Sequence, residues 1–410
     1  MSVLALDGGT PVRTRPFPPR RPFGEREVEL AAQAIRSQNL FGPGGTMVPE
    51  LEGRFAQLYG VEHAVASTSG TASIHVALGA LNPEPGDEII TAPITDAGTI
   101  APILFQNCIP VFADIDDSYN IAPRDVEAKI TARTRAILAV HLFGNPCDLD
   151  ALSDVARRHG IALIEDCCQA HLTDYKGRPC GSIGDIGCFS LQQSKHMTCG
   201  DGGLTITRDA AFAERMALFR DKGWVRKPGA RGYVLLGLNY RMTELQAAVA
   251  LAQLERVADV VRRRNELGDR LSERIRSAPG ILPTPVTPGG RHTYWSYGLR
   301  CVGHDPARFA AALRAEGIPC GEGYTGKPIY LSMEALASRR TFGSSSHPLD
   351  GCHGGRRLDY VEGLCPRAEA ILRQMLTLSI HEHLADDDVA DMAAGICKVA
   401  SGLSPGTGGR

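Results

Sequence analysis

The feature that most constrains the fold is a run of short apolar segments that alternate with helix-like amphipathic segments between residues 71 and 222. Several of the apolar segments, such as "IALIED" at 161–166, are apolar almost throughout, which is typical of parallel strands covered on both faces. We therefore predict strands over 88–93, 109–114, 136–141, 161–166, 186–191 and 203–208, and helices over 71–81, 97–106, 124–131, 149–158 and 211–222. This order predicts an α/β fold with a mostly parallel sheet between two helical layers, in which ligands bind at the carboxyl ends of the strands.

The pattern changes from about residue 243, where a long helical stretch begins, as one helix or as two in succession. Further predicted elements are a strand over 293–302, a helix over 306–315, a strand over 317–323 and a last helix over 386–400. This mixture predicts a smaller α+β domain. The predicted organisation is an N-terminal arm over 1–24, a large domain over 25–258, a small C-terminal domain over 259–400 and a disordered tail over 401–410. The Gly- and Ser-rich stretch 337–355 is predicted to be a mobile loop.

The composition is that of an ordinary globular protein, with 43% hydrophobic and 22% charged residues in a chain of 410. A net charge of −2 gives no indication of nucleic acid or an anionic membrane as a partner, and no apolar run is long enough for a membrane span. The 12 cysteines include no CxxC pair and no Cys/His group with zinc spacing. With no secretory signal at the N-terminus, we expect reduced, buried cysteines, no metal site and a cytoplasmic location.

One lysine stands out in "FSLQQSKHMTCGDGG" at 189–203, where Lys195 lies among small, polar and glycine residues directly after an apolar strand. Such a lysine could be a solvated surface residue, a phosphate ligand or a residue that forms a covalent bond. A P-loop lysine is excluded because the chain contains no GxxxxGK[ST].

Polar residues at two other strand ends favour the third possibility, a lysine that forms a covalent bond. The stretch "STSGTAS" at 67–73 precedes a predicted helix, and a helix start exposes backbone N–H groups that bind anions, although it is equally a common N-cap. Asp166 ends a predicted strand 29 residues before Lys195, and Ser190 lies five residues before it. A lysine amine, a carboxylate and a phosphate cradle are what pyridoxal 5′-phosphate (PLP) needs: a Schiff-base partner, a partner for the pyridine nitrogen and an anion site.

Many stretches together resemble one family, among them "GGTPVR", "STSGTASIHVAL", "PGDEIITAP", "AVHLFGNPCDLDAL", "IEDCCQAH", "GSIGDIGCFSLQQSKHMTCGDGG" and "LGLNYRMTELQAAVA". On these motifs the chain resembles the DegT/DnrJ/EryC1/StrS family of sugar and aminocyclitol aminotransferases, and "GGTPVR" and "SLQQSKH" are closest to its StrS-like branch. The resemblance is dense from about residue 5 to 255 and weaker beyond. It implies a fold-type I PLP-dependent transferase, with a three-layer α/β/α large domain and a smaller α+β C-terminal domain.

The resemblance also implies roles for individual residues. Lys195 matches the Schiff-base lysine, which also moves the proton during catalysis, and Asp166 matches the partner of the pyridine nitrogen. Gln169 matches a residue beside the cofactor ring. The remaining matches concern the cofactor phosphate, and they are Thr71, Ala72, Ser190 and Asn239. Because the family's asparagine reaches the phosphate from the neighbouring subunit, Asn239 implies a homodimer with shared active sites.

One position departs from the family pattern. The family has an aromatic residue that stacks on the cofactor, whereas "TDAGT" places Asp96 there. A carboxylate cannot stack as an aromatic ring does, so Asp96 is a candidate for contact with either the cofactor or substrate hydroxyl groups. A minority branch that dehydrates sugars has histidine in place of the lysine; here the lysine is present and His196 only follows it.

The resulting prediction is a PLP-dependent aminotransferase that uses L-glutamine or L-glutamate as donor and a keto-sugar or keto-cyclitol as acceptor, in aminoglycoside or amino-sugar biosynthesis. Three alternatives stay open at this point: a PLP-dependent dehydratase or aromatising enzyme of the same fold, a PLP-binding protein without turnover, and a non-catalytic scaffold that keeps the fold. The sequence alone identifies neither the acceptor nor the donor.

Overall fold

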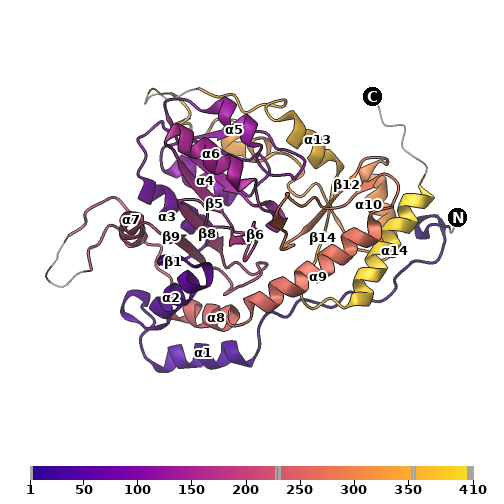
Figure 1. Ribbon diagram of the computed structural model, residues 1–410, viewed down its shortest axis with the longest axis horizontal. Helices are drawn as coiled ribbons and strands as arrows, with labels where there is room; N and C mark the ends of the chain where they lie inside the picture. The colour runs from indigo at the N-terminus through magenta and orange to yellow at the C-terminus, as the bar shows by residue number, and fades with distance from the viewer. Residues whose placement is uncertain (1–2, 227–228, 230–231, 352–353, 355–356, 404–410) are drawn as a thin grey trace.

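A seven-stranded sheet forms the centre of the larger part of the molecule (Figure 1). The computed structural model describes residues 3–226, 229, 232–351, 354 and 357–403. The strand order is β1-β9-β8-β5-β4-β2-β3, with β9 antiparallel to both of its neighbours and the strands from β8 to β3 parallel. The strand bounds are β1 His63–Ser67, β2 Glu88–Thr91, β3 Ile109–Phe112, β4 Thr134–Val140, β5 Ala162–Asp166, β8 Ile186–Ser190 and β9 Gly203–Thr207. The prediction of a mostly parallel sheet is confirmed.

Helices cover both faces of this sheet, because successive residues of each strand point into different cores. Ile89 packs in one core and Ile90 in the other. One face is covered by α1 Glu25–Arg36, α2 Met47–Tyr59, α5 Pro123–Lys129, α6 Leu149–His159 and α8 Glu244–Leu254. The other face is covered by α3 Gly70–Leu81, α4 Ala97–Phe105, α7 Ala210–Arg220 and α13 Pro366–Gln374. The result is the three-layer arrangement expected from the sequence.

The smaller part, called the small domain below, is built on a four-stranded antiparallel sheet in the order β10-β12-β14-β13. Its strands are β10 Ile281–Leu282, β12 Tyr297–Cys301, β13 Gly321–Glu322 and β14 Met375–Leu378, and it packs against α9 Val257–Ile275, α10 Pro306–Ala315 and α14 Asp386–Gly402. The long helical stretch predicted from 243 is two helices, α8 and α9, with a break at 255–256. The division of the chain at residue 258 stays a prediction, and the chain between Ile329 and Leu372 returns to pack in the core beside α3 and α4.

Short elements complete the fold. They are the single turns η1 Ala5–Asp7, η2 Gly42–Gly44 and η3 Leu142–Gly144, the helices α11 Ile329–Ser332 and α12 Glu334–Ala337, and a small sheet of β6 Asp174–Tyr175, β7 Arg178–Pro179 and β11 Gly290–Arg291. Over the described residues, no helix has both the length and the apolar character that a bilayer crossing requires.

The two ends of the chain lie against the small domain. Leu4 is buried in its core, and the arm then runs along the molecule below α9 to reach α1 (Figure 1). At the other end the prediction of a disordered tail from 401 is wrong for its first residues, because α14 continues to Gly402 and Leu403 is buried in the same core. The rest of that tail, 404–410, lies outside the described residues. In the predicted mobile loop 337–355, residues 352–353 and 355 also lie outside, and its mobility stays a prediction.

Candidate active site

A cavity of about 360 Å³ opens at the carboxyl edge of the seven-stranded sheet. It lies where ligands bind in sheets of this kind. Strand ends supply much of its wall: Val140 ends β4, Asp166 ends β5 and Ser190 ends β8. The starts of α3 and α4 supply another part, and the small domain adds two aromatic residues, Trp295 and Tyr324.

Asp166 is the buried carboxylate of the cavity, with 4% of its surface exposed. Thr99 Oγ1 donates a hydrogen bond to Asp166 Oδ2 at 2.8 Å, and the backbone N–H of Cys168 donates to Oδ1 at 3.0 Å. The carboxylate accepts both bonds, and each oxygen keeps a further acceptor site. The side chain is thus fixed in position at the cavity wall.

The first turn of α3 forms an anion cradle with Ser190. Ser69 caps the helix, its Oγ accepting from the N–H of Ala72 at 3.0 Å. Helix geometry leaves the N–H groups of the first turn, those of Gly70 and Thr71, without acceptors inside the helix. Gly70 packs so closely on the neighbouring strand that an added Cβ would lie 2.6 Å from the Cβ of Ser190. Only glycine brings the positive end of α3 this close to the serine hydroxyl.

Lys195 lies half-buried in the loop between β8 and β9, and its side chain lines the cavity. Its Nζ is 4.0 Å from the centroid of the Trp295 ring. Burial lowers the pKa of the Lys195 amine, while the neighbouring Cys168, Asp166 and Asp96 act in the opposite direction. A lowered pKa raises the fraction of neutral amine, which is the form that attacks a carbonyl carbon.

Gln169 is held in one orientation by two hydrogen bonds. Its Oε1 accepts from the backbone N–H of Phe143 at 2.8 Å, and its Nε2 donates to the hydroxyl of Tyr324 at 2.9 Å. The rings of Phe143 and Tyr324 meet edge-on with centroids 5.0 Å apart. These contacts join the glutamine of the large domain to an aromatic wall that comes from the small domain.

Sequence reasoning missed Trp295 and Tyr324. The segment before β12 is fixed across the domain boundary, because the N–H groups of Thr293 and Trp295 donate to the carbonyl oxygens of Gly144 and Phe143 at 2.9 and 2.8 Å. A partial signal did exist, since "TYWSYG" concentrates aromatic residues in a predicted strand. Nothing local in that stretch indicates that it faces a cavity on another domain.

Six of the eight predicted site residues line the one cavity: Thr71, Asp96, Asp166, Gln169, Ser190 and Lys195. Asp96 is exposed at the mouth and also caps α4, its Oδ1 accepting from the N–H of Gly98 at 2.7 Å. The structure does not bring Ala72 to the cavity, because its side chain is buried and its N–H is bonded to Ser69. Asn239 lies outside the cavity of its own chain, exposed in a segment that pairs with Asp221.

His171, which follows Gln169, has a structural position. It is buried, and its Nε2 bonds to the carbonyl oxygen of Ser190 at 2.8 Å. The adjacent cysteines 167 and 168 point to opposite sides, as expected of consecutive residues at a strand end: Cys167 packs in one core and Cys168 lines the cavity.

Comparisons with known proteins place this chain in a family. The model of the DegT/DnrJ/EryC1/StrS aminotransferase family matches residues 23–346. An L-glutamine:2-deoxy-scyllo-inosose aminotransferase from Streptoalloteichus tenebrarius is 36% identical over 423 aligned positions, covering 97% of each chain. The structure of S. venezuelae DesV has a TM-score of 0.82 with 29% identity, over 93% of this chain and 95% of that one. A 3-amino-5-hydroxybenzoic acid synthase also has a TM-score of 0.82, with 25% identity over 95% of this chain and 100% of that one.

Proposed function

Since the chain belongs to the DegT/DnrJ/EryC1/StrS aminotransferase family, we propose that it is a PLP-dependent enzyme that moves an amino group from L-glutamine or L-glutamate to a keto-cyclitol. The observation that carries this proposal is the convergence of Lys195, Asp166 and the start of α3 on one cavity. The full-length similarity to a cyclitol aminotransferase supports the choice of acceptor and the StrS-like branch. A keto-sugar is the second acceptor class, because DesI, whose structure was solved in the presence of its TDP-sugar product, has the same fold at lower identity.

The donor set of the cavity fits PLP. Asp166 would pair with the pyridine nitrogen, and its two hydrogen bonds, which leave acceptor sites on both oxygens, hold it in place for that role. The cradle of Gly70, Thr71 and Ser190 would bind the phosphate, which needs N–H and hydroxyl donors at a helix start. Gln169, fixed by Tyr324, would lie beside the ring.

Lys195 would hold the cofactor through Nζ and, once released, would carry the proton between donor and cofactor. When bound, PLP supplies an electron sink for the carbanion that forms on the amino acid. Burial lowers the pKa of the amine, so more of it is neutral and able to accept a proton, and the resulting ammonium is a stronger acid that can return the proton. Trp295, 4.0 Å from Nζ, limits the access of water to the amine.

Acceptor hydroxyl groups would meet carboxylates at the mouth of the cavity. Asp96 and Asp201 both line it and both are exposed. Carboxylate oxygens accept hydrogen bonds from neighbouring hydroxyls, which cyclitols and sugars offer in series. We assign Asp96 to this role rather than to cofactor stacking.

A homodimer is part of the proposal. Asn239 follows a segment whose apolar side chains are exposed, Tyr233 at 64%, Val234 at 63% and Leu236 at 95%. Apolar side chains so close together favour burial against a second surface. A second copy of this chain would cover them and bring Asn239 toward the partner's cavity. The cytoplasmic location stays a prediction, consistent with the free cysteines of the described chain.

The dehydrating or aromatising reaction is the second candidate, and it rests on the similarity to 3-amino-5-hydroxybenzoic acid synthase. The position of His196 argues against the histidine-dependent branch. That residue is fully buried, and its Nε2 bonds to the carbonyl oxygen of Thr293 at 2.8 Å, whereas Lys195 faces the cavity.

An absorbance titration tests the proposal. Purified protein reconstituted with PLP should show the band of lysine-bound cofactor, and L-glutamine or L-glutamate should convert it to the pyridoxamine form. The Lys195→Ala variant is the control that should bind PLP without that band. A wild-type band that ignores both donors would favour the second candidate, and no band after reconstitution would overturn the assignment of Lys195.

A further inference from the structure

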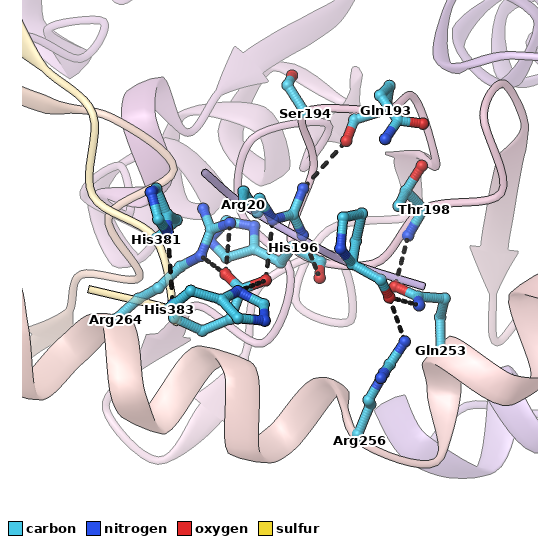
Figure 2. A network of polar contacts seen from close by, with 12 residues as sticks. Arg20, Gln193, Ser194, His196, Thr198, Gln253, Arg256, Arg264, His381 and His383 are labelled. Atoms are coloured by element: carbon cyan, nitrogen blue, oxygen red, sulfur yellow. Dashed lines mark hydrogen bonds and ion pairs between the residues drawn. The ribbon is translucent and has the colours of Figure 1, made fainter. Parts of the chain in front are cut away.

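The loop that carries Lys195 is held on its outer side by an arginine from the N-terminal arm. Arg20 Nη1 donates to the carbonyl oxygen of Gln193 at 3.0 Å, and Nη2 donates to that of His196 at 3.3 Å. These two carbonyl groups lie on either side of Ser194 and Lys195. Figure 2 shows Arg20 between this loop and Arg264, with its guanidinium directed at Gln193 and His196.

The guanidinium is itself fixed by a buried ion-pair network. Arg20 Nε donates to Glu382 Oε1 at 2.8 Å, while Arg264 of α9 donates to Glu382 Oε2 through Nε and Nη2 at 3.0 and 2.9 Å. The side chains are 14%, 11% and 2% exposed for Arg20, Glu382 and Arg264. Burial alone would raise the pKa of Glu382, but the charges of Arg264 and Arg20 lower it to about 2. The carboxylate therefore stays charged and fixes the orientation of the Arg20 guanidinium.

The arm is suited to present this side chain. Its sequence around the arginine, "PFPPRRPFG" at 16–24, has prolines on both sides. Proline fixes φ and favours an extended chain, so little backbone freedom is lost when the arm docks. Arg20 is thus a rigid clamp rather than a flexible surface cation.

Hydrogen bonds also hold the inner side of the same loop. His196 Nε2 bonds to the carbonyl oxygen of Thr293 at 2.8 Å, and Trp295 Nε1 donates to that of Ser194 at 3.1 Å. The backbone N–H of Lys195 donates to the carbonyl oxygen of Gln192 at 2.9 Å. With both sides held, the direction of the Lys195 side chain is set by the backbone.

We propose that Arg20 is a positioning residue for Lys195, acting by clamping the carbonyl groups of Gln193 and His196 against Glu382. It acts through the backbone, because the groups that shift the pKa of Lys195 are its burial and the nearby Cys168, Asp166 and Asp96. The consequence for catalysis rests on the function proposed above; the clamp itself does not. Lysine at position 20 would keep the charge but offers one nitrogen, which cannot serve two carbonyls and a carboxylate in a planar fork.

Hydrogen–deuterium exchange of the full-length protein tests the clamp, read from the peptide that spans 190–199, with and without PLP. Removing two charge-assisted hydrogen bonds in Arg20→Ala should speed exchange there about tenfold, and Arg20→Lys should give a smaller increase. In the same variants the rate at which added PLP develops the lysine-bound band should fall about tenfold. If Arg20→Ala does not fold, Arg20→Lys and Glu382→Gln, which loosens the fork, carry the test.

Arg13→Ala is the matched control. Arg13 lies on the same arm, is 2% exposed and pairs with Asp388 and Asp391 at 2.8 and 2.7 Å, remote from the Lys195 loop. It should lower the melting temperature and leave exchange over 190–199 unchanged. Unchanged exchange in the Arg20 variants, or equal acceleration in Arg13→Ala, would overturn the proposal. Faster exchange in a protein that never binds PLP would instead refute the proposed function and leave the clamp standing.

Discussion

The wall of the cavity comes from two regions of the molecule that differ in how the chain specifies them. In the large domain, Asp166, Ser190 and the start of α3 each stand where a strand of the main sheet ends, so the strand fixes the place of the side chain within a residue or two. In the small domain, Trp295 and Tyr324 reach the cavity only because two domains dock. The large domain holds charged groups in position, whereas the small domain adds an aromatic wall. This difference predicts unequal effects of mutation in the two regions.

The largest effect is expected at Asp166. Asp166→Asn keeps the shape of the side chain but removes its charge, and the amide nitrogen cannot accept a hydrogen bond from Thr99. We expect turnover with L-glutamine to fall by roughly a hundredfold to a thousandfold, as when a charge-stabilising group is lost. Steady-state kinetics on protein saturated with PLP measure the change.

Thr99→Val is the matched control, because it removes one donor to Asp166 and leaves the charge. Its loss should be about tenfold. If both variants lose activity equally, the charge of Asp166 is not what matters, and the comparison between the two regions would lose its main support.

A smaller effect is expected in the small-domain wall. Tyr324→Phe removes the hydroxyl that accepts from Gln169 at 2.9 Å but keeps the ring. Without this bond the Nε2 end of the Gln169 side chain is no longer held, so KM for the acceptor should rise about fivefold and kcat should change less.

Tyr330→Phe provides the contrast. Its hydroxyl bonds to Glu369 at 2.5 Å in the core behind the cavity, so stability should fall while KM stays as in the wild type. A fall in kcat of Tyr324→Phe that matches Asp166→Asn would show that the two regions contribute to catalysis alike.

The last prediction concerns stability in acid rather than activity, and here we expect the smallest difference between the two regions. Burial lowers the pKa of His171 in the large domain to about 4 and that of His292 beside the small domain to about 3. Below the ordinary value of 6.5 the unfolded chain takes up these protons and the folded chain does not, so stability is retained above pH 6.5 and lost as pH falls. Each histidine should cost roughly 1.4 kcal/mol of unfolding free energy per pH unit over that range.

Urea unfolding between pH 7 and 3 measures the slope of the unfolding free energy against pH. His171→Leu should reduce the slope between pH 6.5 and 4, and His292→Leu should reduce it over the same range and further into acid. Equal slopes for wild type and both variants would mean that the rings take up protons without unfolding.

The features that could be predicted from the sequence also divide between the large and the small domain. The six predicted strands of the main sheet are present because unbroken apolar runs such as 136–140 have few other ways to be buried. β1 was missed because "HAVAS" is short and half-buried at its start. β14 was missed because the four residues "MLTL" suit the end of a helix as well as a strand. In the site, Lys195 and Asp166 were found because a strand end marks them. Trp295 and Tyr324 were not, because their place depends on contacts between residues far apart in the chain.

The contacts of Arg20 carry a consequence for the order in which the chain is made. Arg20 leaves the ribosome before the loop that carries Lys195, and Glu382 leaves after both. A nascent chain that stopped before α9 would already contain every strand of the main sheet, yet its arm would have neither Arg264 nor Glu382 to lie against. The loop that carries Lys195 would then gain its outer support only after Glu382 has been made, so a product that stops before α9 would resemble the finished large domain and still lack a fixed lysine.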